Sequence, residues 1–322
     1  MLEMHAPHAP SSFRITVAFA AVYLIWGSTY LVIKLVSTHG AFVMAGTRFL
    51  VAGAVLLAIA HWRGWTQRTD FSARSWLHAT IVGACLMLLG NGGVAIATKS
   101  LDSGIVALMT AITPLWLVGL DALMHRGERV SRWVWLGIAL GVAGVVVLRF
   151  GQLNAASTVS TAGIVLMLIA CFGWALGSVW SKRPGGAHSP VAATAMQMLA
   201  GGMVLLVASF PKEWMLHDEW TLVRASPPDL QVMLLWLYLI VFGSLCGFTA
   251  YIWLLRHQPA ARVATYAYVN PVVALGLGAL ILDEHISGRT VVACGLMLGG
   301  VALIQLVRAR RSIFSRTIAV AE

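Results

Sequence analysis

Residues 13–35 read FRITVAFAAVYLIWGSTYLVIKL, an apolar run whose only charges, Arg14 and Lys34, lie near its two ends. A helix of roughly 20 apolar residues spans the hydrocarbon core of a bilayer. Lipid offers backbone groups no hydrogen-bond partner, so a run that enters it alone must be helical. The run is also longer than the roughly 7–15 apolar residues of a signal peptide, so we expect it to be retained.

Similar runs fill the rest of the chain. The hydropathy pattern predicts ten spans, at residues 13–35, 42–60, 77–98, 103–123, 132–148, 161–181, 191–210, 230–255, 259–281 and 288–307. Hydrophobic residues make up 59% of the 322 residues, charged residues only 11%, and the mean hydropathy is +0.83. In soluble domains, charged residues approach a quarter of the composition. The sequence therefore predicts an all-α membrane protein with ten transmembrane helices.

The net charge of +10 is explained better by membrane topology than by a nucleic-acid partner, because the basic residues stand singly or in small groups between apolar runs. Of the 22 Lys and Arg residues, 15 fall on one side of the predicted topology and 6 on the other, with Arg48 inside a span. Cytoplasmic loops carry the basic excess. Both termini are therefore predicted to be cytoplasmic.

The two halves carry corresponding sequence features. WGS at Trp26–Ser28 in the first span matches WALGS at Trp174–Ser178 in the sixth, and Thr113-Pro114 in the fourth matches Asn270-Pro271 in the ninth. Each half has an odd number of predicted spans, so the second must enter the membrane upside down relative to the first. Inverted repeats of this kind are typical of secondary transporters, with the substrate site near mid-membrane between the halves.

The chain divides accordingly at its polar segment. Residues 1–150 are predicted to form the first five-span repeat, residues 151–160 a linker, and residues 161–322 the second five-span repeat with a basic cytoplasmic tail. The predicted fold is thus two inverted five-helix repeats.

Four segments resemble the drug/metabolite transporter superfamily, specifically its EamA-type ten-span exporters. They are Ile25–Thr29, Gly46–Phe49, Gly90–Gly92 and Ala267–Pro271, and the resemblance covers nearly the whole chain. It implies a basket-shaped bundle in the plasma membrane, the inner membrane of a bacterium, that exports amino acids or other small metabolites by alternating access. A multidrug or toxic-compound exporter of the same fold, or a channel-like facilitator, remains open as an alternative.

Polar and aromatic residues near mid-membrane are the predicted substrate-binding residues, since lipid penalises polar groups that face neither a partner nor a wet cavity. They are Trp26, Tyr30, Arg48, Asn91, Thr110, Trp174, Gln197, Tyr266 and Asn270. Pro114 and Pro271 are predicted hinges, because proline removes a hydrogen bond from a helix and frees a carbonyl one turn earlier.

Each of these residues also has a purely structural explanation. Arg48, the only full charge well inside a span, can bind a substrate carboxylate, pair with a helix C-terminus, snorkel outward or pin two helices together. Trp26 and Tyr30 share a helix face, which suits either an aromatic cavity wall or apolar packing. Asn91 and Gln197 suit either a solute contact or a hydrogen bond between helices.

No catalytic, metal or cofactor site is predicted. The chain has no HExxH, GxSxG or GxxxxGK[ST] motif and no Asp pair within a span, which disfavours an intramembrane enzyme and an ATP-driven pump. Its four cysteines lie in apolar runs, without the spacing of a zinc site or a disulfide framework. The expected partners are the lipid bilayer and a small-molecule substrate, while substrate identity, energy coupling and oligomeric state are left open.

Overall fold

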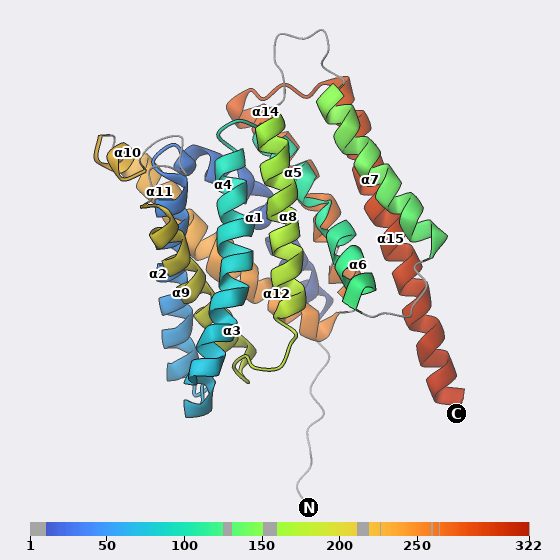
Figure 1. Cartoon of the computed structure of the whole chain (residues 1–322), viewed down its shortest axis with the longest axis horizontal. Coiled ribbons are helices and arrows are strands. Elements are labelled where there is room, and N and C mark those ends of the chain that lie inside the picture. Colours follow the sequence, from blue (N-terminus) through green and yellow to red (C-terminus); the bar gives the residue numbers. More distant parts are fainter. Residues whose placement is uncertain are drawn as a thin grey trace, which may run out of the picture.

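The computed structural model describes residues 11–124, 131–150, 160–210, 219–225, 227–258, 260–263 and 265–321. Within these residues all regular secondary structure is helical (Figure 1), in agreement with the predicted all-α class. The predicted linker, residues 151–160, lies outside the described residues except for Ser160.

The helices of the first half are α1 (Ser12–Ser37), α2 (Ala41–Trp62), the 3-10 helix η1 (Arg68–Phe71), α3 (Ala73–Gly83), the π-helix η2 (Ala84–Gly92), α4 (Gly93–Ala97), α5 (Ser103–Thr110), α6 (Thr113–Met124) and α7 (Arg132–Phe150). The second half follows as α8 (Thr161–Trp180), α9 (Pro190–Ala208), α10 (Glu219–Ala225), α11 (Leu230–Tyr238), the π-helix η4 (Leu239–Cys246), α12 (Gly247–His257), α13 (Ala260–Val263), α14 (Tyr266–Leu282) and α15 (Gly288–Ala321). Elements α3, η2 and α4 run on without a break, as do α11, η4 and α12.

The bundle has the surface of a membrane protein. Seven helical runs among the described residues are long and apolar enough to cross a bilayer, and shorter apolar helices accompany them at Ser103–Leu117, Arg132–Leu148 and Tyr266–Leu282. Large apolar side chains face outward, among them Val272 and Leu280, which is 82% exposed. Soluble monomers rarely expose large apolar patches, whereas helices that face lipid do.

The helix boundaries differ from the predicted spans in three places. The span predicted at 103–123 is interrupted between α5 and α6, and Pro114 lies in the first turn of α6, where its missing N–H costs no helical bond. The span predicted at 259–281 begins as the short α13 and continues as α14, which keeps Pro271 in its interior. Helix α15 continues to Ala321, because residues that are too polar for lipid can still be good helix formers.

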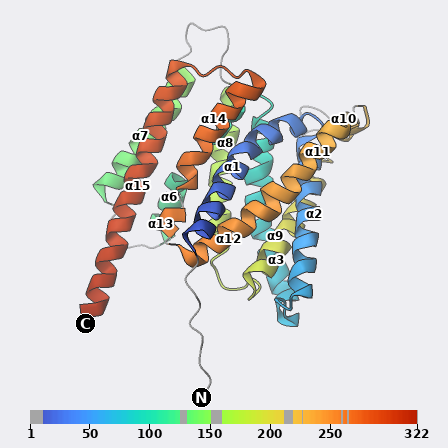
Figure 2. The ribbon, with the colours of Figure 1, turned by 180° about the vertical axis from the view of Figure 1, so that it is seen from behind.

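Helices from the two halves pack against each other. The start of α1 and the end of α15 lie at the same end of the bundle, which we call the termini face, and the turn between α14 and α15 lies at the other end, the far face (Figures 1 and 2). Helices α7 and α15 lie side by side at one edge, and α2 packs along α9. Glycines permit this last contact, since a Cβ at Gly202 would lie 2.9 Å from the carbonyl oxygen of Gly46.

A buried carboxylate from the second half caps α2 at the far face. Glu219, in α10, is 1% exposed and accepts hydrogen bonds of 2.7–3.1 Å from the first three backbone N–H groups of α2, those of Ala41–Val43. The Nζ atom of Lys99 lies 3.5 Å from its Oε1 atom. A helix N-terminus leaves N–H groups without intrahelical partners, and a carboxylate there both satisfies them and is favoured by the helix dipole.

Asp70, in η1, binds the two residues that precede α9, His188 and Ser189, at the termini face. Its fully buried side chain accepts hydrogen bonds from the backbone N–H groups of Gln67 at 2.8 Å, His188 at 2.6 Å and Ser189 at 3.4 Å. Burial alone would raise the pKa of Asp70, but these N–H groups and the nearby His188 side chain lower it below its usual value. Asp70 therefore stays ionised and ties the segment before α3 to α9.

Replacing Asp70 by Asn is expected to lower the free energy of unfolding by about 1–3 kcal/mol at pH 7, because buried N–H donors lose a charged acceptor. Since the pKa of Asp70 is lowered in the fold, its contribution is complete above the ordinary carboxyl range and is lost as the pH falls below about 4. Thermal unfolding of the wild type and of Asp70→Asn in detergent, at pH 7 and below about pH 4, measures this difference in stability.

The matched control for this measurement is Asp229→Asn, at the exposed N-cap of α11, where asparagine caps about as well as aspartate. We expect the control to unfold at the wild-type temperature. Equal midpoints for Asp70→Asn and the wild type at pH 7 would show that the buried carboxylate does not stabilise the helix start.

Candidate functional site

A cavity of about 420 Å³ lies within the bundle, between helices of both halves. Its wall is formed by residues of α1, α2, η2, α4, α5 and α6 from the first half and of α8, α9, η4, α12, α14 and α15 from the second. Cavities that enclose small ligands have volumes of roughly 300–1,000 Å³. The space is therefore large enough for a small metabolite.

Eight of the nine predicted substrate-binding residues line this cavity. They are Trp26, Tyr30, Arg48, Asn91, Thr110, Trp174, Tyr266 and Asn270, and the predicted hinge Pro114 lines it too. Gln197, half-buried on α9, is not among the lining residues, and neither is Pro271, which is buried within α14. The residues are thus brought together around one space, and their role in binding a substrate stays a prediction.

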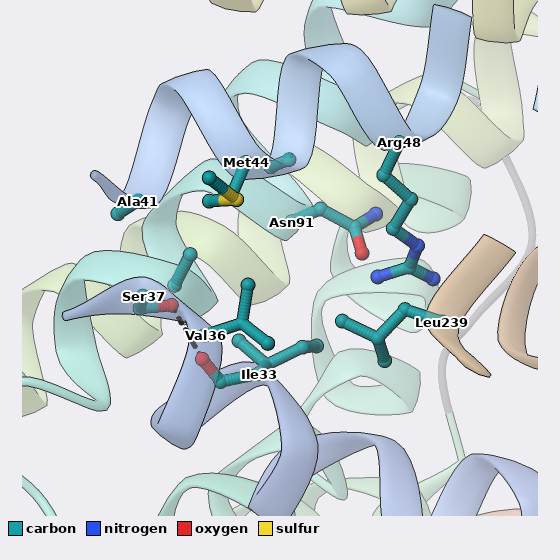
Figure 3. A pocket seen from close by; sticks show the side chains of 10 residues that line it. Ile33, Val36, Ser37, Ala41, Met44, Arg48, Asn91 and Leu239 are labelled. Atoms are coloured by element: carbon teal, nitrogen blue, oxygen red, sulfur yellow. Dashed lines mark hydrogen bonds between the residues drawn. The ribbon is translucent and has the colours of Figure 1, made fainter. Parts of the chain in front are cut away.

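Arg48 extends from α2 into the space between α2 and α1, beside Asn91 and Leu239 (Figure 3). The residue is 7% exposed, and its Nε atom donates to Oγ of Ser244 at 2.9 Å. In the part of the chain that the structure describes, no Asp or Glu forms an ion pair with it. A guanidinium carries five N–H donors in a planar fork, so Arg48 can still bind an anionic group.

Four aromatic rings from three helices form one wall of the cavity. Trp26 on α1 has its ring centre 6.1 Å from that of Phe248, 5.2 Å from that of Tyr251 and 5.3 Å from that of Tyr266. The Nε1 atom of Trp26 donates to the carbonyl oxygen of Gly243 at 3.1 Å, which fixes the ring. Aromatic rings at these separations attract one another. The wall, named here the aromatic wall, offers a pre-formed apolar surface.

Two further aromatic residues of the cavity wall, Trp174 and Tyr30, bring helices together. A Cβ at Gly90 would lie 3.0 Å from the Trp174 ring, so the missing side chain lets Trp174 lie against η2. The hydroxyl of Tyr30 lies 3.2 Å from that of Thr110, which links α1 to α5. These contacts shape the cavity from both halves.

Asn270 and Pro271 place polar backbone at mid-helix in α14. With its amide nitrogen turned toward α1, Asn270 donates to the carbonyl oxygens of Tyr23 at 3.3 Å and Tyr266 at 3.2 Å. Pro271 has no N–H to offer the carbonyl of Ala267, and Ala267 lines the cavity. Unpaired backbone at membrane depth is tolerated where it lines a cavity. Asn270 thus joins α1 to α14, and the Ala267 carbonyl lacks its helical N–H partner.

Both π-helical segments contribute to the cavity wall. Segment η2 supplies Gly90 and Asn91, and segment η4 supplies Gly243 and Ser244. A π-helical turn widens the helix and shifts its carbonyl pattern, and such turns occur frequently at functional sites. Here one η4 carbonyl accepts from Trp26 and the adjacent hydroxyl accepts from Arg48.

Several lining residues were not predicted from the sequence, among them Ser244, Phe248, Tyr251 and Lys182. The first three are spaced four and three residues apart, so they share one helix face. That spacing is present in the sequence, but it occurs in many packed helices and does not by itself indicate a cavity. Lys182 follows the end of α8, where it reads as an ordinary basic loop residue.

The far end of the bundle is held together by an ion cluster. The Nζ atom of Lys34, near the end of α1, lies 2.8 Å from Oε1 of Glu284 and 3.4 Å from Oδ1 of Asp102. Glu284 also accepts from the backbone N–H groups of Ser103 at 2.8 Å and Gly104 at 3.2 Å. Burial would raise the pKa of Glu284, but the Lys34 ammonium and these donors lower it, so the carboxylate is ionised.

The cavity wall includes none of the charged residues of this cluster. It extends instead to Ser178 and to the exposed Lys182 at the termini face. The cavity therefore reaches toward the termini face and ends below the ion cluster at the far face.

A bundle of apolar helices around a cavity of this size and lining defines a multi-pass membrane transporter that acts on small molecules. The chain belongs to the EamA-like transporter family, whose sequence profile matches residues 14–150 and again residues 161–306. The two matches correspond to the two halves on either side of the polar segment.

Two relatives from Escherichia coli (strain K12) are similar over most of their length. One, named "Uncharacterized inner membrane transporter YedA", is 37% identical over 294 residues, which is 90% of each chain. The other, named "Probable amino-acid metabolite efflux pump", is 27% identical over 290 residues, which is 87% of this chain and 90% of the relative. A solved structure described as "Crystal structure of protein" shares the fold, with a TM-score of 0.60 and 22% identity over 93% of this chain and 99% of that one.

A cysteine placed at Ser178, in a variant without native cysteines, is expected to react with a membrane-impermeant maleimide added at the termini face, because Ser178 lines the cavity. The matched control is Ala195→Cys on α9, which is fully buried and does not line the cavity. Labelling of Ser178→Cys only from the far face, or equal labelling of the control, would contradict the position of the cavity.

Proposed function

We propose that this chain is a secondary transporter that exports small metabolites, amino acids or related compounds, across the bacterial inner membrane by alternating access. The observation that carries the proposal is the cavity of about 420 Å³, which is lined by polar and aromatic side chains from both halves. A carrier needs such a site near mid-membrane, where two halves can move relative to one another. The name of the 27% identical relative, an amino-acid metabolite efflux pump, supports the substrate range.

The proposed architecture is ten spans in two inverted five-helix repeats, with hinges at Pro114 and Pro271. The packing pattern supports it, because α1 packs on α12 and α14 of the second half just as α8 packs on η2 and α6 of the first. The buried carboxylates follow the same exchange, since Asp70 precedes α3 and binds the residues just before α9, whereas Glu219 precedes α11 and caps α2. Helix α10, which carries Glu219, lies at the far face, whereas Asp70 lies between the end of α2 and the start of α3, at the termini face, as inversion requires (Figure 1).

The proposed direction of transport follows from the orientation of the cavity. The basic loops favour cytoplasmic termini, so a cavity that reaches the termini face receives its substrate from the cytoplasm. Release on the other side requires the Lys34, Asp102 and Glu284 cluster to separate. These groups pair with one another, and Glu284 also binds the start of α5, so the far end stays closed in the absence of substrate. Substrate binding then favours the state that is open at the far face.

A multidrug exporter is the second candidate, and the aromatic wall favours it, since stacked rings accept many apolar molecules. The two candidates differ in the role of polar contacts. A metabolite exporter depends on groups such as Arg48 and Asn270 to orient its substrate, whereas a multidrug exporter tolerates their loss.

Replacing Tyr266 by Ala is expected to reduce transport at least about fivefold, because it removes one ring of the aromatic wall. The assay is uptake of an amino-acid and drug panel into inside-out vesicles, with and without a pH gradient, together with stimulation by substrate on the opposite side. A carrier shows such stimulation and a channel does not.

The matched control is Tyr268→Ala, two residues along the same helix and outside the cavity wall. We expect the control to transport at the wild-type rate, with both variants inserted in the membrane to the same extent. Unchanged transport in Tyr266→Ala, or an equal loss in the control, would refute the assigned role of the cavity.

A further inference from the structure

The charged residues of the cavity wall, among the described residues, are all basic. Arg48 and Lys182 line the cavity, and none of the lining residues within the described chain is an Asp or a Glu. Arginine remains protonated in proteins, and its charge is little screened where water is scarce. The wall therefore carries positive charge that no carboxylate from the described residues offsets.

The planar guanidinium fork of Arg48 has hydrogen-bond donors to spare. Its Nε atom donates to Ser244 and its guanidinium carbon lies 4.8 Å from the centre of the Phe49 ring, but its two terminal nitrogens have no hydrogen-bond partner among the described residues. Buried polar groups are nearly always hydrogen-bonded, so a buried fork that faces a cavity is suited to a ligand. A carboxylate fits it best, because two parallel N–H donors match its two oxygen atoms.

The aromatic wall begins beside this fork. Trp26 donates to the carbonyl of Gly243, and Arg48 donates to the hydroxyl of Ser244, the next residue in η4. Consecutive Cα atoms are about 3.8 Å apart. A single small molecule can therefore place a carboxylate at Arg48 and an apolar or aromatic body against the rings of Trp26, Tyr251 and Tyr266.

We propose that the substrate is a small organic anion, a carboxylate with an apolar or aromatic body and no ammonium group. The inference rests on the proposed exporter function, and within its small metabolites it selects related carboxylates in place of amino acids. A zwitterionic amino acid would bring an ammonium group into a wall that already holds two cations. The acceptors there, such as the Ala267 carbonyl, are neutral and do not balance that charge.

Three probes that share a phenyl ring and a short chain separate the possibilities. They are radiolabelled 3-phenylpropanoate, which is an anion, phenylalanine, which is a zwitterion, and 2-phenylethylammonium, which is a cation. Equilibrium binding to the purified full chain is expected to be at least about tenfold tighter for the anion than for the zwitterion, and weakest for the cation.

Arg48→Gln is expected to remove this preference, and Arg48→Lys to retain part of it, because lysine keeps the charge but loses the planar fork. Arg262→Gln is the matched control, at an exposed arginine on α13 that does not line the cavity. Gel filtration identifies any Arg48 variant that fails to fold. In that case Ser244→Ala is used instead, because it removes the hydroxyl that orients the Arg48 guanidinium. This variant is expected to weaken anion binding.

Binding of phenylalanine as tight as that of 3-phenylpropanoate, no binding of 3-phenylpropanoate, or an unchanged preference in folded Arg48→Gln would overturn the inference. The exporter function is still supported after any of these results if vesicles transport phenylalanine and this transport is stimulated by substrate on the opposite side of the membrane. The exporter function itself fails only if no compound in the vesicle panel is moved in that way.

Discussion

A helix that begins inside a membrane protein leaves backbone N–H groups that neither lipid nor its own first turn can satisfy. In this chain, buried carboxylates supply the missing acceptors from segments far away in sequence. Glu219 satisfies the start of α2 and Glu284 the start of α5, while Asp70 binds the N–H groups of His188 and Ser189, just before α9. Each cap fixes where a helix begins and which other segment must lie beside it, so the arrangement of the bundle follows from these contacts.

These carboxylates stabilise the two ends of the bundle, and other residues form the cavity between the ends. Glu219 caps α2 and Asp70 holds the residues before α9, and these two helices pack closely through Gly46 and Gly202. Around this pair, the π-helical segments η2 and η4 turn glycines, an amide and a hydroxyl toward the cavity. A polar cavity between two halves that are held at their ends suits the proposed carrier, whose substrate site lies between the halves.

Much of the fold and most of the site could be predicted from the sequence, since lipid allows few solutions. Apolar runs must be helices, and polar residues at mid-depth such as Arg48, Asn91 and Asn270 are costly unless they face a partner or a cavity. The caps were not foreseen, because Asp70 and Glu219 lie outside the apolar runs, where an acid reads as a solvated loop residue. Their burial depends on which helix start lies next to them, and that is a property of the tertiary structure alone.

The residues of the aromatic wall show the same limit. Trp26 was predicted because tryptophan near mid-helix is unusual, and Tyr266 because it lies four residues before Asn270 and close to Pro271. Phe248 and Tyr251 have no such signal within their own span. Gln197 illustrates the converse, since its side chain has the right chemistry and depth, yet α9 turns it away from the cavity wall. Which face of a helix lines the cavity depends on the helices packed around it. The residue type can therefore suggest a site residue, but it cannot show whether the side chain lies in the cavity wall.

The central claim is that the two halves are inverted, with Asp70 and Glu219 as corresponding buried carboxylates at opposite faces of the membrane. The most direct test labels single cysteines at exposed positions beside each cap, Arg68→Cys and Arg224→Cys, with a membrane-impermeant maleimide in intact cells. The account predicts that Arg224→Cys is labelled from outside and that Arg68→Cys is labelled only after the cells are opened. Labelling of both cysteines from the same side would contradict it.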